Sequence, residues 1–301
     1  MMNNVSNPVI DQTEADISVY KKESQFLQAW DRLRRNRTAM IGLAILILLI
    51  FCAVFADKLA PYWYDDEDPV NRYLIKPCPE FPCGTDNLGR CILSRLLYGS
   101  RVSLIIGFVA TAMGAIVGTI IGIFAGYYGG FIDNTIMRLC DMVQSIPSLL
   151  LAIAIAASLG TGLFNMMLAI SIGSIPRYAR TVRASILTVK DQEFIEAANA
   201  IGANDFRIIM KHIFPNCLAP IIVQVTLGVA GSIINAASLS FIGLGIQAPM
   251  AEWGAMLSAG RQYIRDYPHV VMFPGLAIML TILSLNLFGD GLRDALDPKL
   301  K

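Results

Sequence analysis

Residues 102–132 read VSLIIGFVATAMGAIVGTIIGIFAGYYGGFI and contain no charged side chain. A helix needs ~20 mostly apolar residues to cross the hydrocarbon core of a bilayer, where unpaired backbone amides are not tolerated. Because this stretch is longer than one crossing needs, we expect the helix to end near Gly126. The sequence Tyr127-Tyr128-Gly129-Gly130 then predicts a turn. The stretch therefore indicates an all-α membrane protein.

The composition of the whole chain points the same way. Of its 301 residues, 55% are hydrophobic and 16% are charged, and the mean hydropathy is +0.55. A soluble domain is usually ~25% charged. The net charge of +1 gives no general attraction to nucleic acid. The six Cys and two His lack CxxC or HExxH spacing, so we expect no metal site. A soluble enzyme, a secreted disulfide scaffold and a disordered protein are excluded.

Charge-free stretches predict six transmembrane helices. Besides 102–132, they are 38–56, 142–176, 218–244 and 268–289. The 35 residues of 142–176 are too many for one helix, so we divide them at the turn signal Gly160-Thr161-Gly162. The remaining segment, 163–176, is too short to cross ~30 Å. Its helix must continue through Arg177-Tyr178-Ala179 or lie inside the bundle.

The placement of basic residues predicts the orientation and the organisation of the chain. With six transmembrane helices and a cytoplasmic N-terminus, cytoplasmic segments carry sixteen of the 24 Lys and Arg residues. Both termini are therefore predicted to be cytoplasmic. The predicted parts are a cytoplasmic segment 1–37, a first transmembrane helix 38–56, an extracytoplasmic loop 57–101, and a core of five transmembrane helices in 102–301.

The segment before the first transmembrane helix has its own pattern. Phe26, Trp30 and Leu33 recur at helical spacing opposite Arg32 and Arg35. This is typical of a short interfacial helix on the inner leaflet, and a simple polar extension is the alternative. The apolar run that follows exceeds the ~7–15 residues of a signal peptide and has no A-x-A site after it, so we expect no cleavage.

Four glycines recur at every fourth position of the opening stretch: Gly114, Gly118, Gly122 and Gly126. Small residues on one face let two helices approach closely in lipid, so this face predicts helix–helix contact. The contact is either static packing or a smooth surface on which halves of a transporter slide.

A second informative stretch is residues 191–216, DQEFIEAANAIGANDFRIIMKHIFPN. Asp191 is placed to cap a first helix, and Gly202 is placed to end it. Asn204 or Asp205 then caps a second short helix that runs to Pro215. The pattern predicts a helical pair on the cytoplasmic side.

The first helix of this pair has a surface of small residues beside one acid. The residues concerned are Ala197, Ala198, Ala200 and Glu196. Such a surface fits the groove of a partner protein. The alternative is an amphipathic pair that lies on lipid headgroups.

Polar residues within the predicted transmembrane helices are candidates for a translocation path. They are Gln224, Asn235 and Ser238 in the fifth helix and Asn286 in the sixth. Eleven residues, about three turns, separate Gln224 from Asn235, so the two share a face. They line a water-filled cavity or form hydrogen bonds between helices.

Cys78 and Cys83 flank Pro79-Glu80-Phe81-Pro82 in the predicted extracytoplasmic loop. A disulfide between them suits an oxidising compartment, and two free thiols are the alternative.

Four separated motifs, which together cover about residues 25–301, resemble the permease subunits of ABC importers, in particular the "C" type of dipeptide and oligopeptide permeases. Glu196-Ala197-Ala198, Gly202 and His212-Ile213-Phe214-Pro215-Asn216 resemble the EAA loop of these permeases. The other three motifs are Gly84-Thr85-Asp86-Asn87-Leu88-Gly89-Arg90 with the following Leu93-Ser94-Arg95-Leu96-Leu97-Tyr98-Gly99, then Glu252-Trp253-Gly254-Ala255-Met256-Leu257, and Asn286-Leu287-Phe288-Gly289-Asp290-Gly291-Leu292-Arg293-Asp294-Ala295-Leu296-Asp297-Pro298. Cys91 departs from the family, which usually has an acid there, and Cys78 and Cys83 are not part of its pattern.

The resemblance implies a type I ABC importer permease in the bacterial inner membrane. Its partners would be a homologous second permease, two P-loop ATPases, an extracytoplasmic substrate-binding protein and a short peptide as cargo. The chain itself has no GxxxxGK[ST] phosphate loop, so we expect no bound cofactor, with ATP held by the partner subunits. The ATPases would move the cytoplasmic loop as a rigid lever. Its coupling residues would be Glu196, Ala197, Ala198, Ala200, Gly202, His212 and Pro215. Dipeptides, longer peptides, glutathione and nickel chelates all remain open as cargo.

Two other classes of function fit the sequence less well. An ATP-independent channel or ion-coupled carrier would want an ionisable residue deep in the membrane, and no acid or base lies in the middle of a predicted transmembrane helix. A membrane enzyme would need paired acids or a His-rich site. The two histidines, His212 and His269, both lie near helix boundaries. We therefore expect a transport subunit that is not itself an enzyme.

Overall fold

The computed structural model describes residues 25–296 of the chain, with side chains described from residue 29 onward. Within these residues the secondary structure is helical, apart from an isolated β-bridge between Thr85 and Cys91. The helices are α2 (Gln25–Arg35), α3 (Arg37–Val54), α4 (Ala56–Leu59), α5 (Ile92–Tyr128), α6 (Gly130–Gln144), α7 (Ser148–Leu159), α8 (Leu163–Lys190), α9 (Glu193–Ala200), α10 (Asp205–Ile208), α11 (Phe214–Phe241), α12 (Trp253–Gly260) and α13 (His269–Leu296). The predicted all-α class is confirmed.

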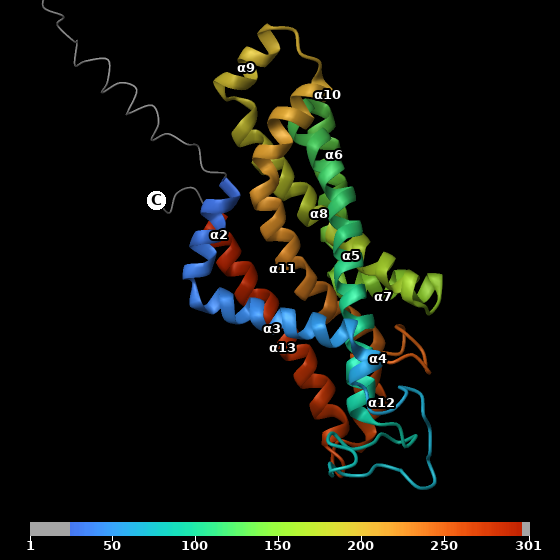
Figure 1. Cartoon of the computed structure of the whole chain (residues 1–301). Helices are drawn as coiled ribbons and strands as arrows, with labels where there is room; N and C mark the ends of the chain where they lie inside the picture. Colours follow the sequence, from blue (N-terminus) through green and yellow to red (C-terminus); the bar gives the residue numbers. More distant parts are fainter. Residues whose placement is uncertain (1–24, 297–301) are drawn as a thin grey trace, which may run out of the picture.

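The helices form an elongated bundle with distinct ends (Figure 1). The pair α9 and α10 lies at one end, and α12 lies at the other beside the loop between α4 and α5. The two predicted loops therefore lie at opposite ends of the bundle, and the side of the membrane that each one faces stays a prediction.

Four helical segments of the described chain are long and apolar enough to cross a bilayer. They are α3, α5, the continuous helix Asp205–Phe241 and α13. Helices α6 and α7 make a fifth crossing if they count as one, although they are bent by 84°. Helix α8 has 28 residues but carries three arginines within its length. The predicted count of six transmembrane helices is therefore not confirmed.

The predicted third transmembrane helix is interrupted. Helix α6 ends at Gln144 and α7 begins after Pro147, which has no backbone N–H to continue the helix. The 12 residues of α7 extend only about 18 Å. The division predicted at Gly160-Thr161-Gly162 is confirmed, since both glycines have positive φ. Helix α8 runs through Arg177 to Lys190, which is one of the two predicted alternatives.

Helix α5 ends at Tyr128, followed by Gly129 with φ +66°, close to the predicted turn. It begins at Ile92, so the last ten residues of the predicted segment 57–101 are helical and not loop. Two arginines lie in the first ten residues of α5, and each donates to a backbone carbonyl oxygen outside the helix. Arg95 donates to the Tyr64 carbonyl oxygen at 2.9 Å, and Arg101 donates to that of Ala53 at 3.0 Å.

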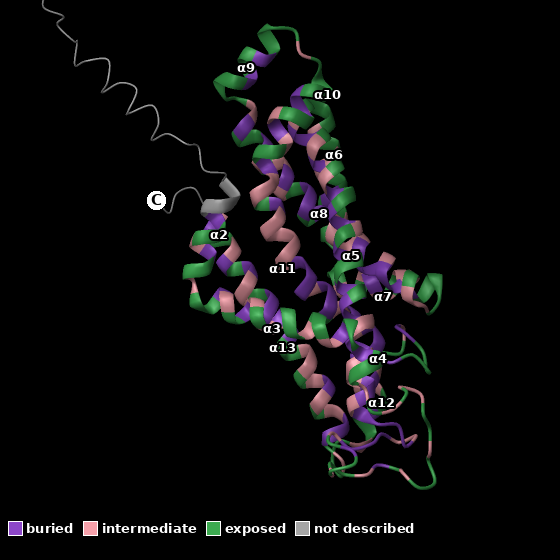
Figure 2. Cartoon of the chain, in the orientation of Figure 1, coloured by how far each residue is buried: buried purple, intermediate pink, exposed green. Residues whose placement is uncertain are grey.

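Helix α3 crosses the bundle against α13 and α5, with much of its surface exposed (Figure 2). An added Cβ at Gly42 would lie 2.7 Å from the carbonyl oxygen of Ser284 in α13, so the two backbones touch. Helix α2 exists as predicted, and Leu33 is buried beside Ala39 and Ala295 while Trp30 is exposed. The side chain of Phe26 lies outside the described residues, and the interfacial role of α2 stays a prediction.

Candidate functional site

Helix α9, the first helix of the loop 191–216, is capped one residue later than the sequence predicts. Gln192, with extended backbone, precedes the first turn of α9, and the Ile195 N–H donates to its carbonyl oxygen at 2.9 Å. Asp191 does not cap α9. It is the C-cap of α8 instead, because α8 continues to Lys190, and Gln192 is the only residue left between this cap and the first residue of α9.

The predicted end of α9 and start of α10 are confirmed. Gly202 has φ +76°, a backbone conformation that favours glycine. Its N–H donates to Asn199, and the N–H of Ala203 donates to Ala198, which is a Schellman motif. The Asn204 side chain accepts from the N–H of Arg207 at 2.8 Å and caps α10. These bonds fix the angle between α9 and α10.

The second helix of the loop is not a short one that stops at Pro215. A π-turn over Ile209–Ile213 joins α10 to α11, and the helix is continuous from Asp205 to Phe241. Pro215 is the second residue of α11, just after the π-helical turn, so the helix runs past it although Pro215 has no backbone N–H to donate. The second part of the loop, from Asp205 on, is therefore the start of a 37-residue helix.

Helix α9 is held in place by its inner face. Ile195 and Ala198 are buried against an apolar cluster that includes Ile186 of α8 and Ile208 of α10. Ala198 therefore does not belong to the predicted outer surface, because it lies one turn from Ile195 on the inward face.

The outer face of the loop is free and partly apolar. The predicted residues Glu196, Ala197, Ala200, Gly202 and Pro215 are exposed, and His212 is half-buried. The sequence did not single out Ile201 and Phe206, which are 84% and 73% exposed. Large apolar side chains in this position are typical of a surface that binds another protein. A sequence signal was available, because these two apolar residues lie on either side of the Gly202 turn, where no face of a predicted helix would bury them.

The glycine face of α5 lies directly against α8. An added Cβ at Gly118 would lie 2.6 Å from Tyr178 Cβ, and one at Gly122 would lie 2.6 Å from the Ala179 carbonyl oxygen. Gly114 meets Ser174 and Gly126 meets Ile186 in the same way. The predicted helix–helix contact is present, while a sliding role stays a prediction.

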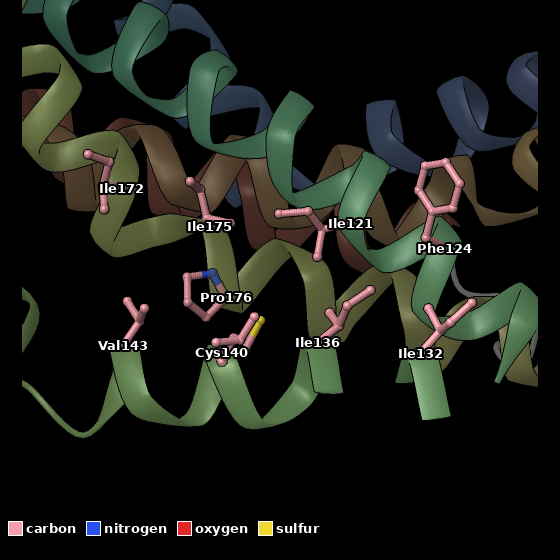
Figure 3. A pocket seen from close by; sticks show the side chains of 10 residues that line it. Ile121, Phe124, Ile132, Ile136, Cys140, Val143, Ile172, Ile175 and Pro176 are labelled. Carbon is pink, nitrogen blue, oxygen red and sulfur yellow. The ribbon is translucent and has the colours of Figure 1, made fainter. Parts of the chain in front are cut away.

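Two ion pairs join α6 to α8, and an apolar groove lies among α5, α6 and α8 (Figure 3). Asp133 pairs with Arg183, and Asp141 pairs with Arg180. The groove has a volume of about 460 Å³ and is lined by Ile121, Phe124, Ile132, Ile136, Leu139, Cys140, Val143, Ile172, Ile175 and Pro176. None of the predicted path residues lines it, so it has the character of a lipid-facing or helix-packing surface and not of a polar path.

The predicted path residues are accessible to different degrees. Gln224, Asn235 and Ser238 are half-buried and Asn286 is exposed. Ser238 donates to the Ile234 carbonyl oxygen of its own helix at 2.8 Å. Over residues 29–296, the side chains of Gln224, Asn235 and Asn286 form no hydrogen bond to another helix of this chain. Contact with cargo stays a prediction.

The end of the bundle opposite to α9 holds a buried polar cluster. In the sequence, its residues stood out only as members of the motif at 84–90 and 93–99. The Asp86 carboxylate accepts from Arg90 Nε at 2.9 Å and from two backbone N–H groups of its own turn. Arg95 lies beside the same carboxylate at 3.7 Å. These buried charges tie the loop between α4 and α5 to the start of α5. Cys78 and Cys83 are free thiols here, with the sulfur of Cys78 accepting from the Phe81 N–H, so the predicted disulfide is absent from this described loop.

Glu252 caps α12 from a buried position beside α5. Its carboxylate accepts from the N–H groups of Gly254 and Ala255 at 2.8 Å and from Ser103 Oγ at 3.3 Å. Burial raises the pKa of Glu252 because it penalises the charged form. The folded chain then holds this proton to higher pH than the unfolded chain does.

Glu252→Gln is expected to change how stability depends on pH. A group whose pKa is higher in the folded chain than in the unfolded chain stabilises the fold at pH values below its unfolded pKa. This stability is lost as the pH rises through the folded pKa, by up to about 1.4 kcal/mol per pH unit. Unfolding temperatures of wild type and variant between pH 4 and 8 will test this. The wild type should lose stability relative to Glu252→Gln as pH rises, and Glu193→Gln, an exposed acid on α9, should follow the wild type. Parallel curves for all three proteins would contradict the prediction.

Bilayer-length helices, a tight glycine contact and a helical loop with an exposed apolar tip define a polytopic membrane protein with a surface that suits a protein partner. Comparison with known families agrees. The chain belongs to the family of binding-protein-dependent transport system inner membrane components, whose model matches residues 118–301. A second model, the N-terminal transmembrane domain of oligopeptide transport permease C, matches residues 24–77.

Similar proteins and structures carry related descriptions. The dipeptide transport system permease protein DppC of Alkalihalophilus pseudofirmus is 49% identical over 282 residues, covering 94% of this chain and 92% of that protein. The glutathione transport system permease protein GsiD of Escherichia coli O157:H7 is 49% identical over 275 residues, covering 90% of each. A chain from an inward-facing MetNI methionine ABC transporter superposes with a TM-score of 0.55 at 20% identity, covering 68% of this chain and 98% of that one. The fold is that of type I ABC importer permeases.

Proposed function

We propose that this chain is one of two permease subunits of an ATP-driven importer of short peptides. The observation that carries the proposal is the rigid loop 191–216, which matches the EAA loop pattern and presents Ile201 and Phe206 to solvent. A peptide cargo is supported by 49% identity to a dipeptide permease over nearly the whole chain. Glutathione is the second candidate cargo, since a glutathione permease is 49% identical over 275 residues.

In this function the loop 191–216 faces the cytoplasm and rests in a cleft of an ATPase subunit. When two ATPases close on ATP, they move α9 with them. The motion passes into α8, which precedes α9 in the chain, and into α11, which follows it. ATP is held by the partner subunits, and this chain holds no cofactor. A homologous second permease completes the path, and an extracytoplasmic binding protein delivers the cargo to the opposite end of the bundle.

Purification of the tagged chain in mild detergent is expected to recover a P-loop ATPase and a second permease in stoichiometric amounts. Mass spectrometry of the eluate identifies them. The purified complex, reconstituted with its binding protein, should import a labelled dipeptide only with ATP. A homo-oligomer of this chain that transports by itself would contradict the proposal. Competition by unlabelled dialanine against glutathione decides between the two cargoes.

A further inference from the structure

The inner end of α5 touches the loop 191–216 although it is remote from it in the chain. The Tyr127 hydroxyl, on the last turn of α5, donates to Asp205 Oδ1 at 2.9 Å. The Lys190 ammonium, at the end of α8, donates to the Tyr127 carbonyl oxygen at 2.6 Å and lies 5.8 Å from the ring centroid. Tyr127 is therefore hydrogen-bonded to the last residue of α8, before α9 in the chain, and to the first residue of α10, after α9.

These contacts join the ends of three long helices. Tyr127 is close to the end of the 37-residue α5, and Asp205 begins the 37-residue helix Asp205–Phe241. Lys190 is the last residue of α8. The Tyr127 ring also packs against the apolar cluster that supports Ile195 and Ile208 beneath α9.

Elsewhere in its inner half, α5 has a smooth surface. Between Thr111, which hydrogen-bonds to Ser232 at 2.8 Å, and Tyr127, the described part of α5 has no side-chain hydrogen bond to another helix. The contact along this stretch is the glycine face against α8, from Gly114 to Gly126. Packing of this kind resists separation of the helices but resists displacement along the axis only weakly, because a row of glycines offers few side chains to interlock.

We propose that Tyr127 is a positioning residue that locks the inner end of α5 to the loop 191–216, so that α5 moves with α8 and α11 during transport. This inference rests on the proposed function. Without the Tyr127–Asp205 bond, motion of the loop would still reach α8 and α11 through the chain. Helix α5 would keep its bond to Lys190 and its ring packing but lose its bond to the helix that begins at Asp205, and it would lag behind that helix. ATP hydrolysis would then continue, and fewer cycles would move cargo.

Tyr127→Phe tests the proposal because it removes the hydroxyl and keeps the ring. The measurement is the ratio of ATP hydrolysed to dipeptide imported by the complete complex in proteoliposomes. We expect this ratio to rise about fivefold, the effect of one hydrogen bond to a charged group that is partly exposed. Tyr128→Phe is the matched control, since Tyr128 is exposed and stacks on Phe124, and it should keep the wild-type ratio.

A double-mutant cycle assigns the effect to the bond itself. Asp205→Ala should raise the ratio as Tyr127→Phe does, and the double variant should be no worse than either single variant. Asp205→Asn retains an acceptor oxygen and should stay near the wild-type ratio. An unchanged ratio in Tyr127→Phe would overturn the proposal. So would a proportional loss of ATP hydrolysis and uptake with a lower unfolding temperature, since that marks a merely structural role. If the wild-type and Tyr128→Phe complexes hydrolyse ATP but import no peptide, the proposed function fails, independently of Tyr127.

Discussion

Gly202→Trp is expected to reduce ATP-dependent uptake by about 100-fold while the chain still inserts and folds, a loss typical of a disrupted central interface contact. Gly202 has φ +76° and no atom within 4 Å of an added Cβ, so the indole would project from the loop tip and meet only a docked partner. The strain of a left-handed non-glycine residue is about 1–2 kcal/mol, which is small beside the stability of a folded chain. Uptake of labelled dipeptide and the yield of monodisperse protein are measured together.

Two further variants separate blocked docking from a distorted loop. Gly202→Asn accepts the left-handed conformation with a short side chain and should retain most uptake. Glu196→Lys reverses the charge of an exposed residue on the outer face of α9 and should abolish uptake without changing the fold. Full uptake in both Gly202→Trp and Glu196→Lys would show that the loop does not couple to an ATPase.

Local signals in the sequence predicted the parts of this site that depend on local chemistry. Gly202 and Asn204 were recognised because a left-handed stop and an N-cap need particular residue types at particular positions. Asp191 looked equally suitable as a cap, but α8 runs to Lys190 and uses this residue at its own end. The sequence of the loop alone could not reveal where the preceding helix stops.

Burial and continuity were harder to predict because they depend on distant residues. The three alanines of α9 look alike in sequence, yet Ala198 faces inward because Ile186 and Ile208 supply a cluster on that side. Pro215 looked like a helix boundary, but the helix continues through a π-helical segment at Ile209–Ile213 and beyond Pro215. Arg95 and Arg101 looked like loop residues because they are charged. The carbonyl oxygens that accept their hydrogen bonds lie in the loop after α4 and in α3, which the local sequence does not reveal.

Gly118→Leu is expected to destabilise the chain by about 3 kcal/mol or more, because the added side chain has no room to relax. The first added atom would lie 2.6 Å from Tyr178 Cβ and 2.7 Å from the Ile175 carbonyl oxygen, and a backbone oxygen cannot swing aside. Helices α5 and α8 must separate, which also opens the contact that supports Tyr178. The yield of monodisperse protein and the thermal midpoint in detergent measure the effect. Gly231→Leu is the control, because Gly231 in α11 has open space around it and should tolerate the change.

The milder variant Gly118→Ala distinguishes static packing of the glycine face from sliding. If the face only packs, the thermal midpoint and peptide uptake should fall together, because uptake then depends on the amount of folded complex. If α5 shifts along α8 during transport, a single methyl group that interlocks with Tyr178 should reduce uptake per folded complex while Gly231→Ala does not. Equal midpoints for Gly118→Leu and wild type would show that the two helices are not in the close contact described above.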